Sequence, residues 1–329
     1  MRPIAAAVTG ALLFCASLLA QNNRSAVSLT GNDTASCTVP DPCRTFDVAI
    51  SKSNAGGEVI VLSSAGYGPF TVTKSISIIS PPAYHAALAP TSGNAITINA
   101  DNALVVLRGL TLNGSLGGQN GILFTGQIAS PSGTTLSVEN CVIGGFSGNG
   151  ISFVRNGILF VTNLIARQNV YDAVYVDGSP GNPSWASIDH ALLEKSLNAA
   201  LEVQNASVAI RDSIAAAGYV GFWALAIGPA STADVSVENC QATHNTYGYI
   251  AGNGGGTAQL IVSDSVAWAN GYGLFADDNG TVRASNNRVS RNSIGLWQLG
   301  AGVFRSRGNN TVDGNSTATS GTITTFGPM

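Results

Sequence analysis

The chain has 329 residues, only 10% of them charged, and a formal net charge of −3. This slight negative balance argues against nucleic acid as a partner, because phosphate binding requires a basic stripe. A chain of this length can bury a large core, and one continuous repeat structure could contain all of it.

Residues 1–20 are expected to be a secretory signal peptide. Arg2 is followed by an apolar stretch from Ile4 to Ala20, and cleavage is expected after Ala20. The alternative is a retained membrane helix, but the stretch is at the short end for a span and lacks a basic flank after it. We therefore expect an exported protein (periplasmic, cell-surface or secreted) without a transmembrane segment after cleavage.

Residues 21–54 are expected to form an N-terminal segment that ends in a short helix. Cys37 and Cys43 lie close together, and in an exported chain such a pair is expected to form a small-loop disulfide. Residues 42–50 have the pattern of an amphipathic helix. Its buried face would carry Phe46, Ala49 and Ile50.

A short motif recurs through most of the remaining chain: a small residue followed by an apolar pair. The spacing between copies ranges from 21 residues (Ala200 to Gly221) to 29 residues (Gly121 to Gly150). A period in this range predicts a stacked solenoid rather than an ordinary globular core. The small residues are Gly121, Gly150, Ala173, Ala200, Gly221, Gly248, Gly273 and Gly295.

Two columns of polar residues keep fixed places in the repeat and are expected to mark tight corners between short parallel strands. Asn and Asp suit such corners because they tolerate left-handed backbone conformations and bond their own turn. The first column is Asn140, Asn163, His190, Asp212, Asn239, Asp264 and Asn286. The second is Asn169, Ser196, Asn245, Asn270 and Asn292.

Cys141 and Cys240 occupy equivalent positions four coils apart, each after the phrase Ser-Val-Glu-Asn. Four coils correspond to roughly 19 Å at the usual spacing of strands. A disulfide needs Cα atoms within about 7 Å. These two cysteines are therefore expected to be buried free thiols.

The repeat and its polar corner columns resemble those of the right-handed parallel β-helix proteins, the pectate-lyase-like superfamily. The resemblance covers residues 55–315 and implies an all-β, single-domain solenoid of roughly ten coils, expected to be a monomer. It also implies that the helix in residues 42–50 caps the open N-terminal end, which would otherwise expose apolar stacks and strand edges. Residues 316–329 are expected to be either a loose tail or a closing strand.

The enzymes of this superfamily have motifs that this chain does not match. The segment from Gly66 to Pro69 only partly follows the motif of pectin methylesterases, because it lacks the glutamate. The pair Asp277-Asp278 stands without the other motifs of polygalacturonases, and no phrase matches the calcium-dependent lyases. None of these activities can be transferred to the chain by resemblance.

One outward column of the repeat places Asp189, Arg211 and Glu238 on successive coils. Asp189 and Glu238 would lie on the order of 10 Å apart, near the separation of an inverting carboxylate pair, so the three residues are candidate catalytic groups. The favoured interpretation is a solvated ion ladder that contributes about 0–1 kcal/mol per pair. No apolar environment that would raise a carboxyl pKa is evident around them.

A second outward column contains Tyr175, Trp223, Phe275 and Trp297, two residues past the small position of their coils. Such a row could stack on sugar rings, which repeat at nearly the spacing of one coil. The alternative is that these rings stack on one another along the sheet or lie under a long turn. The sequence has no HxH, HExxH or CxxC spacing, so we expect neither a metal site nor a cofactor.

The leading functional hypothesis is an exported β-helix protein that presents an extended surface to a polysaccharide or a partner protein. The alternative is a carbohydrate-active enzyme, a polysaccharide lyase or glycoside hydrolase, with its site on an outward face. A bare structural scaffold is the third hypothesis. A deep groove with two or more carboxylates and an Arg or Lys would favour the enzyme, and a flat aromatic face would favour binding.

Overall fold

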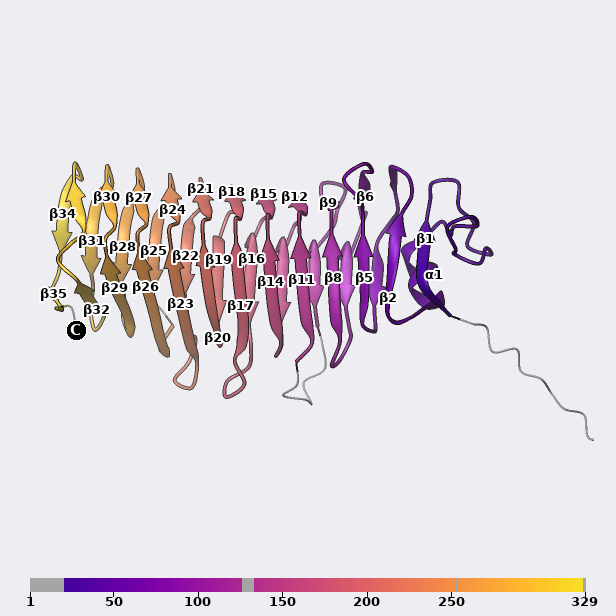
Figure 1. Cartoon of the computed structure of the whole chain (residues 1–329). Helices are drawn as coiled ribbons and strands as arrows, with labels where there is room; N and C mark the ends of the chain where they lie inside the picture. The colour runs from indigo at the N-terminus through magenta and orange to yellow at the C-terminus, as the bar shows by residue number, and fades with distance from the viewer. Residues whose placement is uncertain (1–20, 126–132, 253, 328–329) are drawn as a thin grey trace, which may run out of the picture.

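The computed structural model describes residues 21–125, 133–252 and 254–327 and shows an elongated stack of coils (Figure 1). The expected signal peptide, residues 1–20, lies outside the described residues. Three parallel sheets run the length of the stack, and only one short helix is described beside them. The predicted all-β parallel solenoid is confirmed. No helix within the described ranges has the length and apolar character needed to span a membrane.

Each complete coil contributes one strand to each sheet, in a fixed order along the chain, and β1 and β35 add one further strand at each end of sheet 1. Sheet 1 has 13 strands: β1 (Asn22–Val27), β2 (Ser53–Val61), β5 (Ile76–Ile79), β8 (Leu104–Arg108), β11 (Thr135–Glu139), β14 (Ile158–Thr162), β17 (Ser184–Asp189), β20 (Ala206–Arg211), β23 (Thr232–Glu238), β26 (Thr257–Ser263), β29 (Gly280–Ser285), β32 (Val303–Ser306) and β35 (Ile323–Thr325).

Sheets 2 and 3 have 11 strands each. Sheet 2 is made of β3 (Ala65–Gly66), β6 (Ala86–Leu88), β9 (Leu110–Asn113), β12 (Val142–Gly144), β15 (Ile165–Arg167), β18 (Leu192–Glu194), β21 (Ile214–Ala216), β24 (Gln241–Thr243), β27 (Val266–Trp268), β30 (Arg288–Ser290) and β33 (Thr311–Asp313). Sheet 3 is made of β4 (Phe70–Val72), β7 (Ile96–Ile98), β10 (Ile122–Phe124), β13 (Ile151–Val154), β16 (Val174–Asp177), β19 (Ala199–Gln204), β22 (Val220–Ala224), β25 (Tyr247–Ala251), β28 (Tyr272–Ala276), β31 (Ile294–Gln298) and β34 (Thr317–Ser320).

The core lies between the three sheets, where inward side chains of successive coils stack like on like. Phe124 stacks on Phe153 with ring centroids 4.2 Å apart, and Phe222 stacks on Tyr249 at 5.2 Å. The hydroxyl of Tyr249 donates to backbone carbonyl groups inside the coil, so its burial leaves no unpaired polar atom. Each large side chain buried in this way stabilises the fold by about 1.5–3 kcal/mol relative to exposure.

The two polar columns form the corners that the repeat predicted. Every member of the first column has a left-handed backbone; Asn140 has φ 52° and His190 has φ 54°. In the second column, the Asn270 amide donates to the Oδ1 atom of Asn292 in the next coil at 3.0 Å. The ladder breaks at Ser196, whose hydroxyl has no partner among the described residues.

The N-terminal end is covered by β1 and by α1 (Phe46–Lys52), as Figure 1 shows. Helix α1 buries Phe46, Ala49 and Ile50, and the Phe46 ring contacts Phe70 at 4.8 Å. Because β1 pairs with β2, the solenoid begins before residue 55, the boundary expected from the sequence.

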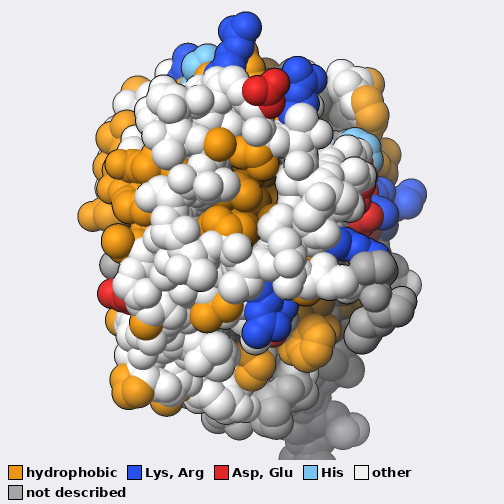
Figure 2. Space-filling view, turned by 90° about the vertical axis from the view of Figure 1, so that its left-hand side faces the viewer, with side chains coloured by type: hydrophobic (Ala, Val, Ile, Leu, Met, Phe, Trp, Pro, Cys, Tyr) orange, Lys and Arg blue, Asp and Glu red, His pale blue; other side chains and the backbone are white. Residues whose placement is uncertain are grey.

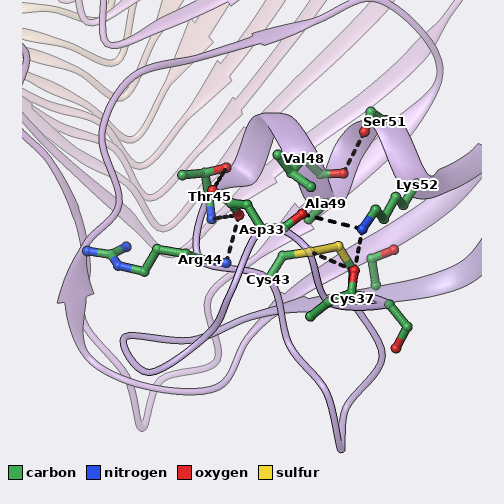
Figure 3. The surroundings of a disulfide bond; sticks show 12 residues. Asp33, Cys37, Cys43, Arg44, Thr45, Val48, Ala49, Ser51 and Lys52 are labelled. Atoms are coloured by element: carbon green, nitrogen blue, oxygen red, sulfur yellow. Dashed lines mark hydrogen bonds between the residues drawn. A yellow bond between two sulfur atoms is a disulfide. The ribbon is translucent and has the colours of Figure 1, made fainter.

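The loop that leads into α1 is held by a disulfide and by one aspartate (Figure 3). Cys37 and Cys43 form the disulfide, with Cα atoms 4.6 Å apart. The carboxylate of Asp33 accepts hydrogen bonds from the backbone N–H groups of Arg44 and Thr45, both at 2.9 Å. These contacts satisfy donors at the start of a helix whose own N-cap side chain makes no capping bond.

The C-terminal end continues past residue 315, because β34 pairs with β31 and β35 pairs with β32. Of the two expectations for residues 316–329, the described part has closing strands. Figure 2 looks onto this end and shows hydrophobic side chains near its middle.

The two remaining cysteines, Cys141 and Cys240, are free and buried. Burial raises the pKa of the Cys141 thiol to about 11 and that of Cys240 to about 12. Both thiols therefore stay protonated and act as small apolar core groups.

Candidate functional site

The outward face of sheet 1 carries a shallow groove at the middle of the solenoid. The groove has a volume of about 380 Å³. It lies over β17, β20, β23 and the adjoining residue of β26, and we call it the sheet 1 groove. The outward side chains that line it are Trp185, Ser207, Ala209, Asp234, Ser236 and Ile261.

The groove exists because small side chains follow one another in register. Along its floor, Ser187, Ala209 and Ser236 occupy the same position on successive coils. The same row has larger apolar side chains at its two ends, Phe160 and Ile261, and both are exposed. These two ends are four coils apart, which is roughly 19 Å at the spacing of parallel strands.

Trp185 forms one side of the groove and is 61% exposed. The residue in register with it on the next coil is Ser207, and the one after that is Asp234. An indole that projects beside a serine instead of another large side chain keeps its face open to solvent. Trp185 was not among the residues singled out from the sequence, although its place in the alternation of β17 marks it as outward.

Asp189, Arg211 and Glu238 lie on successive coils as expected, two residues further along their strands than the floor row of the groove, and they are not among its lining residues. The Nε atom of Arg211 lies 3.2 Å from Oδ1 of Asp189, which also contacts Nδ1 of His190 at 2.8 Å. Glu238 makes no ion pair with another described residue. The arrangement matches a solvated ion ladder, because the guanidinium of Arg211 is 62% exposed.

Asp189, His190 and Asp212 bring three potential metal ligands within 4.8 Å of one another. Two of them already have partners: Arg211 and His190 contact Asp189, and the amide of Asn239 donates to Asp212. A guanidinium bound to the same carboxylate opposes a divalent cation. We therefore do not assign a metal site to this cluster.

The aromatic column of sheet 3 has the predicted register but not the predicted openness. Tyr175, Trp223, Phe275 and Trp297 lie on one line that also includes Glu202 and Ile250. Phe275 is only 3% exposed, and its ring stacks on Trp297 at 4.0 Å. Of the two alternatives for this column, the structure therefore has the second at Phe275, where the rings stack on one another along the sheet.

The physical reason is a second column of large side chains beside the first. Tyr247 and Tyr272 stack at 4.9 Å, and Tyr272 also stacks on Trp297 at 4.5 Å. Together with Val220 and Ile250, these rings form a small apolar cluster on the outside of sheet 3, separate from the core. Trp223 and Trp297 remain half-buried at its edges.

Three carboxylates at the N-terminal side of that cluster were not recognised as a group from the sequence: Asp172, Asp177 and Glu202. The amide of Asn198 donates to Oδ1 of Asp172 at 2.8 Å and to Oε2 of Glu202 at 2.7 Å. The hydroxyl of Tyr175 donates to Asp177 at 3.1 Å. No Lys or Arg of the described ranges forms an ion pair with any of the three.

Burial makes two of these carboxylates, Asp172 and Glu202, reluctant to ionise. Desolvation, followed by the nearby charge of Glu202, raises the pKa of Asp172 to about 7. Desolvation also raises the pKa of Glu202. The side chains are closed to a ligand, because Asp172 is 4% and Glu202 6% exposed. One signal could have found Asp172: it follows two asparagines, Asn120 and Asn149, at the same place in the repeat, and each of the three side chains accepts a hydrogen bond from the backbone N–H of its equivalent on the next coil.

Comparison with known proteins identifies the architecture. The family model described as "Right handed beta helix region" matches residues 181–324. No curated protein sequence matches the chain significantly.

Several solved structures have a similar fold. The pectate lyase Pel9A is 15% identical, with a TM-score of 0.56 over 89% of this chain and 79% of that one. The A-module of the Azotobacter vinelandii mannuronan C-5 epimerase AlgE6 is 12% identical, with a TM-score of 0.58 over 87% of this chain and 97% of that one. The A-module of AlgE4 from the same organism is 11% identical, with a TM-score of 0.57 over 83% and 91%. At these identities the likeness concerns the fold.

Proposed function

Because this chain is a right-handed parallel β-helix repeat protein, we propose that it binds a polysaccharide along the outward face of sheet 1, in the sheet 1 groove. The groove runs in the direction of the solenoid axis, so an extended sugar chain can lie in it with about one ring per coil. Export, which the signal-like residues 1–20 suggest, would place this face in contact with extracellular or periplasmic glycans.

The observation that carries the proposal is the open indole of Trp185 beside a floor of serine and alanine. Sugar rings have apolar faces that pack on aromatic rings, and their hydroxyl groups need acceptors close by. Asp234 and Ser207 supply polar atoms on the same side of the groove as Trp185.

The structural neighbours are consistent with this proposal. Pectate lyase Pel9A and the two mannuronan C-5 epimerase modules are named for polysaccharide substrates. The shared fold offers a long outward sheet on which a polymer can lie.

A catalytic role is the second candidate, and the row Asp189, Arg211, Glu238 along the groove favours it. The two carboxylates lie two coils apart, on the order of 10 Å. However, Asp189 is already engaged by Arg211 and His190, so it is not free to accept a proton from a substrate. The geometry therefore supports binding over catalysis.

A pair of tryptophan variants tests which face binds. Trp185→Ala removes an exposed ring, and we expect affinity for a retained polysaccharide to fall at least about fivefold while stability stays within about 0.5 kcal/mol. Trp297→Ala is the matched control on sheet 3, and it should lower stability without changing affinity. Affinity electrophoresis over acidic and neutral polysaccharides measures both.

The opposite pattern would overturn the placement: binding kept in Trp185→Ala and lost in Trp297→Ala would move the site to sheet 3. Binding kept in both variants would remove both aromatic faces from consideration. A screen for reducing ends and unsaturated products on the same polysaccharides tests the catalytic candidate, and product formation that Glu238→Gln abolishes would establish it.

A further inference from the structure

A second hollow lies on a different face, on the outside of sheet 2 near the C-terminal end. Its volume is about 410 Å³. The side chains of β27, β30, β33 and the corner after β30 line it, and we call it the Trp268 pocket. Its lining residues include Trp268, Arg288, Ser290, Arg291, Thr311 and Asp313.

The shape of the pocket follows from one small residue between two larger ones. Trp268, Ser290 and Asp313 occupy the same outward position on three successive coils. The outer two are on the order of 10 Å apart, so the serine between them leaves a slot about one ring thick. On the side away from the slot, His244 of the preceding coil packs edge-on against the indole at 4.9 Å.

Two arginines line the pocket, and neither forms an ion pair with a carboxylate of the described residues. Arg288 lies in register between Val266 and Thr311, and the guanidinium of Arg291 is 5.8 Å from the centre of the Trp268 ring. The ion pairs of the described residues all lie elsewhere, at Arg24, Arg108 and Asp189. Asp313 accepts a hydrogen bond from the backbone N–H of Gly314 and makes no ion pair with the described arginines.

We propose that the Trp268 pocket is a second binding site, which takes an anionic sugar residue. The sugar ring lies in the slot between Trp268 and Asp313, and its acid group lies between the guanidinium groups of Arg288 and Arg291. Guanidinium groups suit this role because they bind carboxylate or sulfate through paired, charge-assisted hydrogen bonds. Asp313 and Ser290 accept hydrogen bonds from sugar hydroxyl groups across the slot.

This site is independent of the sheet 1 groove, because it lies on another sheet and shares no residue with it. It also differs in character: the floor of the groove is uncharged, and Phe160 and Ile261 stand at the two ends of its row. The Trp268 pocket has a short slot flanked by two free positive charges, which selects for charge on a single residue of a glycan.

The test uses the full chain with a trimer of galacturonic acid and the neutral galactose trimer, measured by calorimetric titration. We expect the acidic trimer to bind about tenfold more tightly than the neutral one, and to weaken as salt rises from about 50 to about 500 mM. Arg288→Gln should lower affinity for the acidic trimer about tenfold while leaving the neutral trimer unchanged. Trp268→Ala should weaken both.

Arg305→Gln, at an exposed arginine on sheet 1, is the control that should leave binding on sheet 2 unchanged, and Trp185→Ala reports any binding in the sheet 1 groove. If Arg288→Gln binds the acidic trimer like the unaltered chain, or if neither trimer binds, the proposal is wrong. If Trp185→Ala abolishes this binding and Arg288→Gln does not, the trimer occupies the groove instead. Because Arg288 is exposed, its variant is expected to fold even if Trp268→Ala does not.

Discussion

The outward faces of sheet 1 and sheet 3 place tryptophans in equivalent orientations but in different surroundings. Trp185 on sheet 1 has Ser207 as its neighbour on the next coil and is mostly exposed. Trp297 on sheet 3 has Phe275 as its neighbour on the preceding coil, and the two rings stack at 4.0 Å. The register decides only that a side chain points outward; the size of its neighbours decides whether a ligand can reach it.

The comparison also separates two uses of aromatic surface. On sheet 3, two adjacent columns of rings bury one another and contribute to stability. On sheet 1, a row of serine and alanine prevents such packing and leaves a groove. A substitution in the aromatic cluster of sheet 3 should therefore change stability. A substitution in the groove of sheet 1 should change binding.

The largest effect is expected from Phe275→Ala. Removing this nearly buried ring from the sheet 3 cluster should lower the free energy of unfolding by about 3–5 kcal/mol, because it leaves a cavity beside Trp297. Urea unfolding measures the change, with Trp185→Ala as the exposed counterpart. Equal destabilisation by both variants would contradict the contrast between the two faces.

A comparable but pH-dependent effect is expected from Asp172→Asn. The pKa of Asp172 is raised from 3.8 to about 7 in the folded chain, so its stabilising protonated form is present in acid and is lost as pH rises between those values. Its neighbours Glu202, Asp177 and Tyr175 offer no positive charge to offset ionisation. The variant removes the charge and places at this position the amide that Asn149 has on the preceding coil.

We therefore expect Asp172→Asn to be more stable than the unaltered chain at pH 8, on the order of a few kcal/mol, and similar to it at pH 4. Unfolding free energies measured from pH 4 to pH 8 test the sign. Asp189→Asn, at an exposed ion pair, is the control and should show no such gain. At each pH, the measured quantity is the stability of Asp172→Asn minus that of the unaltered chain. If this difference is smaller at pH 8 than at pH 4, the raised pKa of Asp172 is wrong.

A smaller effect is expected from filling the sheet 1 groove. Ala209→Phe places a ring on the floor between Ser187 and Ser236 and makes this face resemble sheet 3. Polysaccharide affinity should fall about tenfold, about 1.4 kcal/mol, while the free energy of unfolding changes by less than about 1 kcal/mol. Unchanged affinity would mean that the ligand does not lie on this floor.

The smallest effect is expected from Arg211→Gln. This change removes an exposed ion pair with Asp189, which contributes about 0–1 kcal/mol and is screened by salt. Unfolding at low and high salt should show a difference only at low salt. A loss larger than about 2 kcal/mol would indicate that Arg211 supports the groove in a way that the exposed geometry does not suggest.

Much of the fold could be predicted because the repeat is local. The corner column at Asn140, His190 and its equivalents requires a left-handed backbone that asparagine and aspartate adopt readily, so the corners are visible in the sequence. Once the corners are placed, parallel stacking fixes the register. This is why the line from Asp189 to Glu238 was predicted correctly.

The candidate sites were predicted less well, for a physical reason. Whether Phe275 is buried depends on Tyr247 and Trp297, which belong to other coils. Trp297 lies in the same column as Phe275, and Tyr247 lies in the neighbouring one. Whether Trp185 is open depends on the serine of the next coil. The buried carboxylates Asp172 and Glu202 are joined by Asn198, a contact that no pattern within one coil reveals.

The sequence by itself determined the period, the corners and the residues that share a column, because these depend on backbone preferences and on alternation within a strand. Only the tertiary structure decided which columns are exposed and which carboxylates lose water. The exposure of a side chain and its loss of water depend on all the side chains around it. These neighbours come from several coils and from two adjacent columns, and they meet only when the coils stack.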